Sequence, residues 1–171
     1  MIKIQHRVNT IGHLKKIKIN YGIEIDIRNH GNELFVIHDP FSTEAVSFSQ
    51  WIKNYNHQFL IVNVKEEGLE PLLLMILNEH KIHDFFILDE SIPYIIKYAL
   101  KGVQNFALRV SEFESVETAL ALNLYLKNYE RCVDWIWLDT FAGKPLPIND
   151  VRKLIDAGFK LCQVSPELHH V

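Results

Sequence analysis

The sequence predicts an α/β fold of the (β/α) barrel type, with about seven βα units and no evident eighth strand. Short runs rich in β-branched and aromatic residues alternate with longer amphipathic segments, which is typical of a parallel sheet covered by helices. The runs recur every 20–37 residues without an obvious break along the 171-residue chain. No glycine-rich nucleotide loop follows any of them, so a doubly wound sheet is the less favoured alternative.

Eight segments have the composition and alternation of strands. They span residues 2–6, 22–28, 34–38, 59–65, 85–88, 106–110, 135–138 and 160–164. The segment 34–38 differs from the others, because the turn-forming stretch Asn29-His30-Gly31-Asn32 before it is too short for a crossover helix. This segment is therefore predicted to return as the hairpin partner of strand 22–28, and the other strands are predicted to run parallel.

Helices are predicted between the strands, at residues 12–20, 47–55, 69–81, 91–101, 113–130 and 147–158. Ser47 or Ser49 is a suitable N-cap for the second of these helices. Pro93 fits the first turn of the fourth helix and Gly102 fits its end, since proline favours helix starts and glycine favours helix ends. The amphipathic pattern therefore supplies a covering helix for each parallel strand except the last.

The number of strands is lower than a complete barrel requires. Typical (β/α)8 barrels have eight βα units in about 250 residues, whereas this chain ends just after the seventh, at "VSPELHHV". An open barrel would expose the edges of its first and last strands, which proteins normally cover. A second copy of the chain could cover them in a homo-oligomer. No low-complexity linker divides the sequence, so one domain over residues 1–171 is the simplest interpretation.

The composition narrows the class of protein. The chain is 48% hydrophobic and 23% charged, which provides ample material for a core. A net charge of −3, without a basic stripe, argues against a nucleic-acid partner but still allows a small phosphorylated substrate. Cys132 and Cys162 are predicted to be reduced core thiols. The N-terminus lacks the apolar core of a signal peptide and the longest apolar run, 72–77, cannot span a bilayer, so we expect a cytoplasmic protein without a membrane span.

Polar residues gather at the predicted C-terminal ends of the strands, where (β/α) barrels carry their active sites. These residues are His6, Arg7, Glu24, Asp26, His38, Asp39, Asn63, Lys65, Asp89, Glu90, Arg109, Asp139 and Glu167. A strand that ends at solvent explains one or two charged residues, but it does not explain paired acids inside an apolar strand.

Glu24 and Asp26 are that pair. Strand alternation puts both acids on one face and the three neighbouring isoleucines on the other, so we expect the acids to face the barrel axis. Two close, buried carboxylates repel each other and lose hydration, and a divalent cation would relieve both problems. Oxygen ligands without a nearby Cys or His pair favour Mg²⁺ or Ca²⁺ over Zn²⁺. The alternative is a salt bridge with Arg7 or Arg28.

His6 and His38 are the candidate acid and base, because imidazole titrates near neutral pH. Alone, each is more often structural, but both are predicted at the same strand ends as the cations Arg7 and Lys65. Asn63 shares a strand face with Lys65, so both should point into the site. Cations, a metal and two histidines together suit a reaction at a phosphate group.

In order and spacing, these residues resemble the signature of the glycerophosphodiester phosphodiesterases, within the larger group of phospholipase-C-like phosphodiesterases. The family pattern is His-Arg-Gly, then Glu-x-Asp, a glycine turn and His-Asp. The chain has His6-Arg7, "GIEIDIR", Gly31 and "LFVIHD", and "IVNVK" is similar to the family's Glu-x-Lys strand. The resemblance covers roughly residues 1–66. It implies a (β/α)8 barrel and metal-dependent hydrolysis of a glycerophosphodiester-like or glycosyl-phosphodiester small molecule.

The resemblance also implies roles for the matching residues. His6 and His38 would be the general acid/base pair, and Glu24 and Asp26 would bind a divalent cation, Mg²⁺ or Ca²⁺. Substrate binding would fall to Arg7 and Lys65 at the phosphoryl oxygens. Apart from the resemblance, Asn63 and Arg109 are further substrate-binding candidates because they lie at predicted strand ends.

Two departures from the family pattern affect these expectations. Val8 stands where the family has Gly, and Asn63 stands where it usually has a third acidic metal ligand. The missing acid and the short C-terminus favour an alternative, a non-catalytic sugar-phosphate-binding or regulatory domain, whereas the two histidines oppose it. In a further alternative, Arg7 or Lys65 replaces the cation in a metal-independent, lyase-type enzyme.

Overall fold

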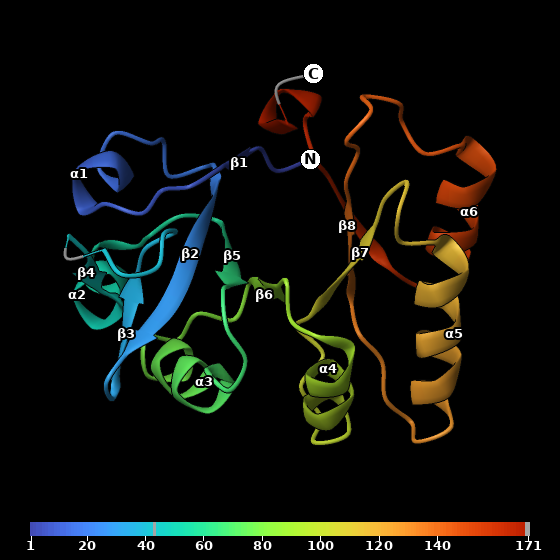
Figure 1. Ribbon diagram of the computed structural model, residues 1–171, viewed down its shortest axis with the longest axis horizontal. Helices are drawn as coiled ribbons and strands as arrows, with labels where there is room; N and C mark the ends of the chain where they lie inside the picture. The colour runs from blue at the N-terminus through green and yellow to red at the C-terminus, as the bar shows by residue number, and fades with distance from the viewer. Residues whose placement is uncertain (43, 170–171) are drawn as a thin grey trace. The chain divides into compact units, whose positions relative to one another are not determined.

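The structure is a computed structural model that describes residues 1–42 and 44–169 (Figure 1). The chain divides into two compact units, Met1–Glu90 and Ser91–Val171. Each unit has a β-sheet and helices, so the predicted α/β class is confirmed. Closure of the strands into a barrel stays a prediction.

Among its described residues, the first unit contains a six-stranded sheet. Its strands are β1 (Ile4–Gln5), β2 (Gly22–His30), β3 (Glu33–Val36), β4 (Val46–Ser47), β5 (Phe59–Val64) and β6 (Phe85–Leu88). The strand order is β4-β3-β2-β5-β6, and β1 also pairs with β2. β1, β2, β5 and β6 are parallel, whereas β3 returns antiparallel to β2 as predicted from its short connection. β4 was not predicted, because two residues are too few to show an alternation.

One edge of β2 changes its partner along its length, and this change positions the candidate site. Gly22 and Ile23 pair with β1, whereas Ile27–His30 pair with β3. Between these stretches, the carbonyl of Glu24 accepts a hydrogen bond from the amide of Val8 at 2.8 Å. The carbonyl of Asp26 accepts one from the amide of Ile37 at 2.9 Å. The segments that carry His6-Arg7 and His38 therefore both lie along the middle of β2.

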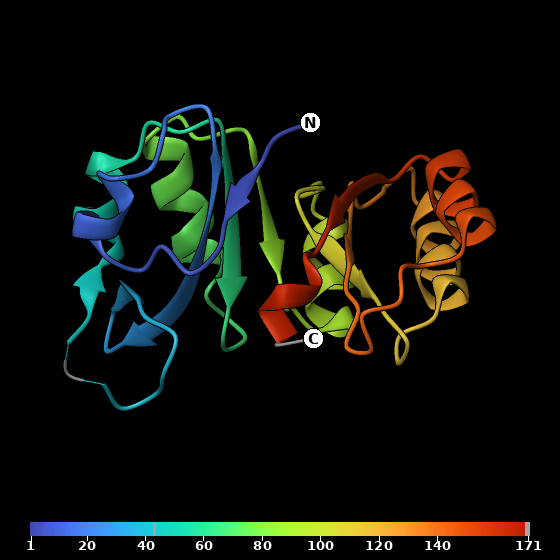
Figure 2. The ribbon, with the colours of Figure 1, turned by 90° about the horizontal axis from the view of Figure 1, so that it is seen from above.

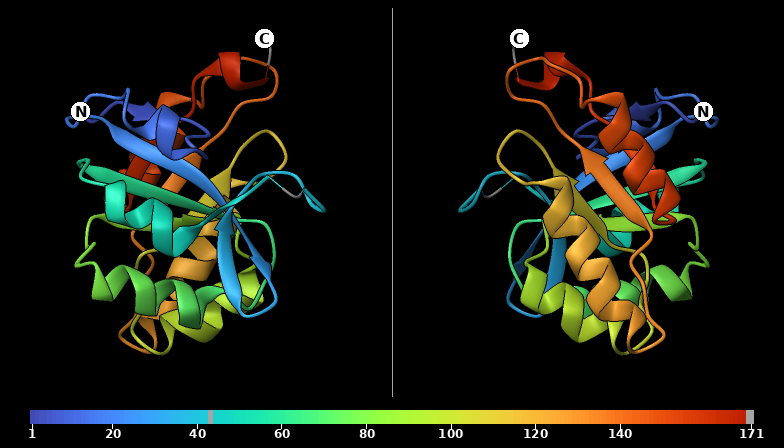
Figure 3. Two further views of the ribbon diagram at one scale, coloured as in Figure 1. Left: turned by 90° about the vertical axis from the view of Figure 1, so that its left-hand side faces the viewer. Right: turned by 90° about the vertical axis from the view of Figure 1, so that its right-hand side faces the viewer.

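Short helices cover the first unit: α1 (Ile11–Leu14), α2 (Phe48–Trp51), the 3-10 turn η1 (Ile52–Asn54) and α3 (Glu70–Glu79). Figure 2 shows α2 and α3 on the same side of β2 and β5, and Figure 3 shows them from that side. Ser47 caps α2 as predicted, accepting from the amide of Gln50 at 3.2 Å. α1 is shorter than the predicted 12–20, because alternating β-branched isoleucines follow Leu14 and disfavour a longer helix.

The second unit, where described, has a three-stranded parallel sheet of β7 (Ala107–Val110), β8 (Trp135–Leu138) and β9 (Lys160–Gln163) in that order. Its helices are α4 (Ile92–Ala99), α5 (Val116–Lys127), α6 (Ile148–Asp156) and the 3-10 turn η2 (Pro166–His169). α5 and α6 lie together on one side of this sheet (Figure 3). α5 begins later than predicted because Ser115 caps it, accepting from the amide of Thr118 at 3.2 Å.

Two further expectations concern the chain as a whole. Cys132 and Cys162 are free, partly buried thiols, and burial raises the pKa of Cys162 to about 12. Within residues 1–42 and 44–169, none of the helices has the length and hydrophobicity that crossing a bilayer requires.

Candidate active site

The paired acids of β2 are buried together. Glu24 is 0% and Asp26 is 1% exposed, and the isoleucines between and beside them are fully buried on the opposite face of the strand. The parallel register of β2 and β5 pairs Asp26 with Asn63, which is 7% exposed. Two carboxylates and one amide therefore lie on adjacent strands, shielded from water, as the alternation predicted.

Glu24 is held by the chain segment after β1. Its Oε2 accepts a hydrogen bond from the amide of Arg7 at 2.7 Å and lies 3.5 Å from Nε2 of His6. Burial, and then the charge of Asp26, raise the pKa of Glu24 to about 7. Its other oxygen, Oε1, is buried and accepts no hydrogen bond from any described residue.

Asp26 has a different set of partners. Nζ of Lys65 lies 3.0 Å from its Oδ1. Asn9 holds it at two points, because the Asn9 amide nitrogen donates to Oδ2 at 2.7 Å and the Asn9 carbonyl oxygen accepts from the Asp26 backbone amide at 3.0 Å. The ion-pair partner is therefore Lys65, and not Arg7 or Arg28, which the sequence had suggested as alternatives to a metal. Sequence reasoning missed Asn9; its place two residues after Arg7 was the available signal.

His38 is fixed between a cation and a carboxylate. Its Nε2 lies 2.9 Å from Nη2 of Arg7, and its Nδ1 lies 2.7 Å from Oδ1 of Asp39. A guanidinium can only donate, so Nε2 accepts from Arg7 and Nδ1 carries the hydrogen that bonds to Asp39. The hydrogen bond from His38 in turn holds the pKa of Asp39 below its usual range. Nε of Arg28 donates to the His38 carbonyl at 3.0 Å.

His6 lies in a more enclosed environment than His38. Burial is the largest cause that lowers the pKa of His6, and the charge of Arg7 is the next. At neutral pH, the His6 imidazole is therefore uncharged. The negative charge of Asp26 acts in the opposite direction and raises the pKa of His6, but burial and Arg7 outweigh it.

The loop that carries these residues is anchored in the core. Arg7 has a φ of 53°, in the left-handed region that few residues other than glycine adopt. Val8, which replaces the glycine of the family pattern, is 0% exposed, and its carbonyl accepts from Nε1 of Trp51 at 3.1 Å. The side chain of Val8 thus packs in the core, and the unusual backbone conformation falls on Arg7.

Arg109 lies in the second unit, and its charged partners lie there too. It forms an ion pair with Asp139, which is 1% exposed as a side chain, and its Nε lies 3.9 Å from Glu114. His169 also contacts Asp139, at 2.6 Å. The other seven predicted site residues belong to the first unit, where contacts and strand register join them: His6, Arg7, Glu24, Asp26, His38, Asn63 and Lys65.

The donor atoms near the paired acids suit a hard cation. The described residues contain no group of three or more His, Cys, Asp or Glu side chains arranged to hold a metal ion. However, Asn63 Oδ1 is, like Glu24 Oε1, a buried oxygen that accepts no hydrogen bond from the described residues. Together with the Asp26 carboxylate they form an all-oxygen set, which is the preference of Mg²⁺ and Ca²⁺. The chemistry of the donors therefore fits the predicted cation.

Comparison with known proteins gives information on the fold. No protein-family model matches the sequence, and no curated protein matches it. Among solved structures, the chain is similar to a protein from Agrobacterium tumefaciens that bears the name glycerophosphoryl diester phosphodiesterase, with a TM-score of 0.70 and 11% sequence identity over 95% of this chain and 84% of that one. A glycerophosphoryl diester phosphodiesterase from Parabacteroides distasonis matches with a TM-score of 0.46 and 12% identity, over 95% and 81% of the two chains. At this identity the likeness concerns the fold, and the chain shares the fold of the family that its N-terminal motifs resemble.

Proposed function

We propose that this protein hydrolyses small-molecule phosphodiesters, with His6 and His38 as the acid/base pair. The observation that carries the proposal is the pairing of Arg7 with His38 beside the His6–Glu24 contact, which brings two imidazoles and a guanidinium to one stretch of β2. A pocket that only binds a sugar phosphate needs cations but has no need for two histidines with distinct environments.

The two histidines suit different proton-transfer roles. His6 has a lowered pKa and is uncharged at neutral pH, so it can accept a proton from an attacking hydroxyl. His38 bonds through Nδ1 to the Asp39 carboxylate, which orients its ring, so we assign it the donation of a proton from Nε2 to the leaving oxygen. For this step, Arg7 must exchange its contact with Nε2 for the substrate phosphate.

The proposed reaction has two steps. A hydroxyl next to the phosphodiester loses its proton to His6 as its oxygen bonds to phosphorus, and the bond from phosphorus to the leaving alcohol breaks as that oxygen takes a proton from His38. Water then opens the cyclic phosphate, with the two histidines in exchanged roles. Arg7 and Lys65 would hold the phosphoryl oxygens, where negative charge accumulates.

We further propose that Glu24, Asp26 and Asn63 bind Mg²⁺ or Ca²⁺ through oxygen atoms. A bound cation would neutralise phosphoryl charge and make the attacking hydroxyl more acidic. One contact favours a second candidate, a metal-independent enzyme: Nζ of Lys65 lies 3.0 Å from Asp26, where it can supply the positive charge itself. In that case the cyclic phosphate could be the final product, as in a lyase.

Hydrolysis of glycerophosphodiesters, which have a hydroxyl next to the phosphate, with and without EDTA, tests the proposal. We expect His6→Ala and His38→Ala each to lower kcat by about 10²–10⁴-fold, the usual contribution of an acid or base. His83→Ala, which changes an exposed histidine before β6, serves as the matched control. Absence of activity with every divalent ion would favour the non-catalytic binding domain, and activity that survives EDTA would favour the metal-independent enzyme.

A further inference from the structure

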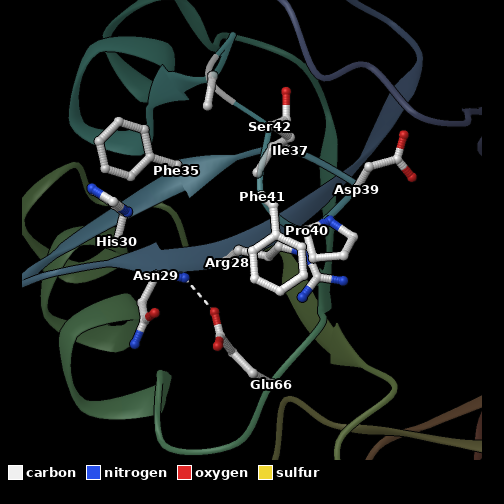
Figure 4. A pocket seen from close by; sticks show the side chains of 11 residues that line it. Arg28, Asn29, His30, Phe35, Ile37, Asp39, Pro40, Phe41, Ser42 and Glu66 are labelled. Atoms are coloured by element: carbon white, nitrogen blue, oxygen red, sulfur yellow. Dashed lines mark hydrogen bonds between the residues drawn. The ribbon is translucent and has the colours of Figure 1, made fainter.

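A cavity lies beside the proposed active site, on the same face of β2. The alternation that puts Glu24 and Asp26 on this face also puts Arg28 and His30 there, each pair of neighbours about 7 Å apart along the strand. Arg28 and His30 line a cavity of about 730 Å³, together with residues of β3, of the segment that follows it and of the segment after β5 (Figure 4). The polar row of β2 therefore runs from the acid pair directly into this cavity.

The cavity adjoins the proposed active site at His38, which contacts two of the residues that line the cavity. Asp39 lines the cavity and contacts Nδ1 of His38 at 2.7 Å. Arg28 also lines it and donates through Nε to the His38 carbonyl at 3.0 Å. A group bonded to a phosphate held by Arg7 would therefore have the cavity as its neighbour, because Arg7 contacts the other ring nitrogen of the same histidine.

The walls of the cavity differ in chemistry. Phe35, Ile37 and Phe41 provide apolar surface, whereas Arg28, Asp39 and Glu66 provide charged groups of both signs. Arg28 uses only Nε, and its two Nη groups donate to no other side chain or carbonyl in the described part of the chain. Glu66 accepts from the backbone amide of Asn29 through one oxygen, Oε1. A guanidinium and carboxylates are the partners that adjacent hydroxyl groups bind best, since each offers two parallel hydrogen-bonding positions.

Phe41 lines this cavity with an unusual backbone conformation. Its φ is 61°, a left-handed conformation that is an outlier for a bulky side chain, and its ring is fully exposed. Figure 4 shows this ring among the side chains that line the cavity. Such strain costs free energy and is found mostly at ligand-binding and catalytic positions. An exposed ring here offers a flat apolar surface for the C–H face of a sugar or cyclitol ring.

Other classes of alcohol fit less well. A quaternary ammonium alcohol would be attracted by Asp39 and Glu66 but repelled by Arg28, and a cavity of about 730 Å³ is within the range for drug-sized ligands rather than such a small group. A fatty acyl chain would bury three charged side chains without satisfying them. A neutral polyhydroxy ring is not repelled by Arg28, and its hydroxyl groups can both donate to the carboxylates and accept from the guanidinium.

We propose that this cavity binds the alcohol substituent of the phosphodiester, and that this alcohol is a neutral, hydroxyl-rich ring. The proposal rests on the proposed phosphodiesterase function for the position of the phosphate. It makes Phe41, Arg28 and Glu66 specificity-determining residues, distinct from the proposed acid/base pair.

The test compares two substrates that differ in this alcohol, glycerophosphoinositol and glycerophosphocholine. We expect the wild-type protein to prefer the inositol ester by at least about tenfold in kcat/KM. Phe41→Ala and Glu66→Gln should each lower this preference about three- to tenfold. Phe41→Trp should keep the wild-type preference, because the larger ring retains the stacking surface. Glutamine keeps the acceptor for the Asn29 amide, so Glu66→Gln does not disturb the backbone. Ile19→Ala, which changes another exposed apolar residue of the first unit, should leave the preference unchanged.

A binding measurement separates this proposal from the proposed function. Calorimetric titration of His38→Ala with glycerophosphoinositol, and of the double variant with Phe41→Ala, needs no turnover. Weaker binding in the double variant than in His38→Ala would support the cavity proposal. If the wild-type protein in addition hydrolyses neither ester, the proposed function is overturned while the cavity proposal stands. Hydrolysis with equal kcat/KM for the two esters, or a preference that Phe41→Ala does not alter, would overturn the cavity proposal and leave the phosphodiesterase standing.

Discussion

Glu24 and Asp26 are neighbours on one strand face with the same burial, yet their environments differ. Asp26 has the Lys65 ammonium and the Asn9 amide as partners, whereas Glu24 has the Arg7 backbone amide and the uncharged ring of His6. A buried carboxyl without a cation keeps its proton to a higher pH, which is the direction found for Glu24. In the absence of a metal, Glu24 is therefore about half protonated near neutral pH.

This asymmetry predicts how stability depends on pH in EDTA. The pKa of Glu24 is raised from 4.5 to about 7 in the folded state, so between these values the folded protein binds the extra proton. Stability is therefore highest below about pH 4.5 for this group and falls as pH rises to 7, by an amount on the order of 3 kcal/mol. Glu24→Gln cannot ionise and should escape this loss.

Urea unfolding of the wild type and of Glu24→Gln at pH 5, 6, 7 and 8 measures the difference. We expect the variant to become the more stable protein as pH rises, with Glu79→Gln, an exposed glutamate at the end of α3, as the control. If the stability of Glu24→Gln and of the wild type depends on pH in the same way, the pKa of Glu24 is not raised in the folded state. Ca²⁺ should remove most of the difference, because a bound cation displaces the proton of Glu24.

Asn63 is the third oxygen donor of the proposed cation site. Its Oδ1 is buried and accepts no hydrogen bond among the described residues, and strand register puts it beside Asp26. Asn63→Glu adds a third carboxylate to the site, so the metal-free variant should have a lower Tm than the wild type, through repulsion and desolvation. The same charge should tighten Ca²⁺ binding by about tenfold or more, since charge count sets affinity in oxygen-ligand sites.

Calorimetric Ca²⁺ titration and thermal unfolding, neither of which needs turnover, check this prediction. Asn63→Ala removes the amide oxygen and should weaken binding while leaving the metal-free Tm higher than that of Asn63→Glu. If Asn63→Glu lowers the metal-free Tm but gains no affinity for Ca²⁺ or Mg²⁺, the acid pair does not form a cation site. Lys65 would then be the permanent counter-ion of Asp26, as the 3.0 Å contact allows.

At the scale of elements, β2 and β3 were the most predictable part of the chain. Strict alternation of isoleucine and acid can occur only in a strand with one polar face, and a four-residue connection excludes a helix. The convergence of His6, Glu24 and His38 follows from these two facts, because both flanking segments bond to the carbonyls of β2.

Other features depend on loop conformation, which periodicity does not encode. Asn9 reaches Asp26 only because the chain bends at Arg7, with its positive φ, and because Trp51 holds the Val8 carbonyl. The choice of Lys65 over Arg7 or Arg28 as the partner of Asp26 likewise depends on side-chain reach. The cavity lined by Arg28 and Phe41 was not predictable for the same reason, since its far wall is the segment after β3.

In the molecule as a whole, the predicted site residues are divided unequally between the two units. Seven of the eight lie in the first unit, and the eighth, Arg109, lies in the second, where it pairs with the buried Asp139. The predicted barrel requires that the strand ends of both units serve one substrate, because all strands of a closed barrel end at one face. Whether Arg109 belongs to the substrate site is therefore a test of the barrel prediction itself.

Hydrogen exchange with sn-glycerol 3-phosphate and Ca²⁺ provides this test. Ligand binding to the proposed site should slow exchange in peptides covering residues 5–9, 24–30, 37–39 and 63–66, because their amides lie next to the bound phosphate and opening becomes less frequent. If the sequence-predicted barrel is correct, residues 107–112 should be protected as well. Arg109→Met should abolish that protection and leave the four peptides of the first unit protected.

Glycerol without phosphate is the control and should protect none of these peptides. Protection confined to the first unit would remove Arg109 from the substrate-binding residues. Absence of protection in the first unit would contradict the site built on β2, because a phosphate held by Arg7 and Lys65 must reduce the opening of the segments that carry them.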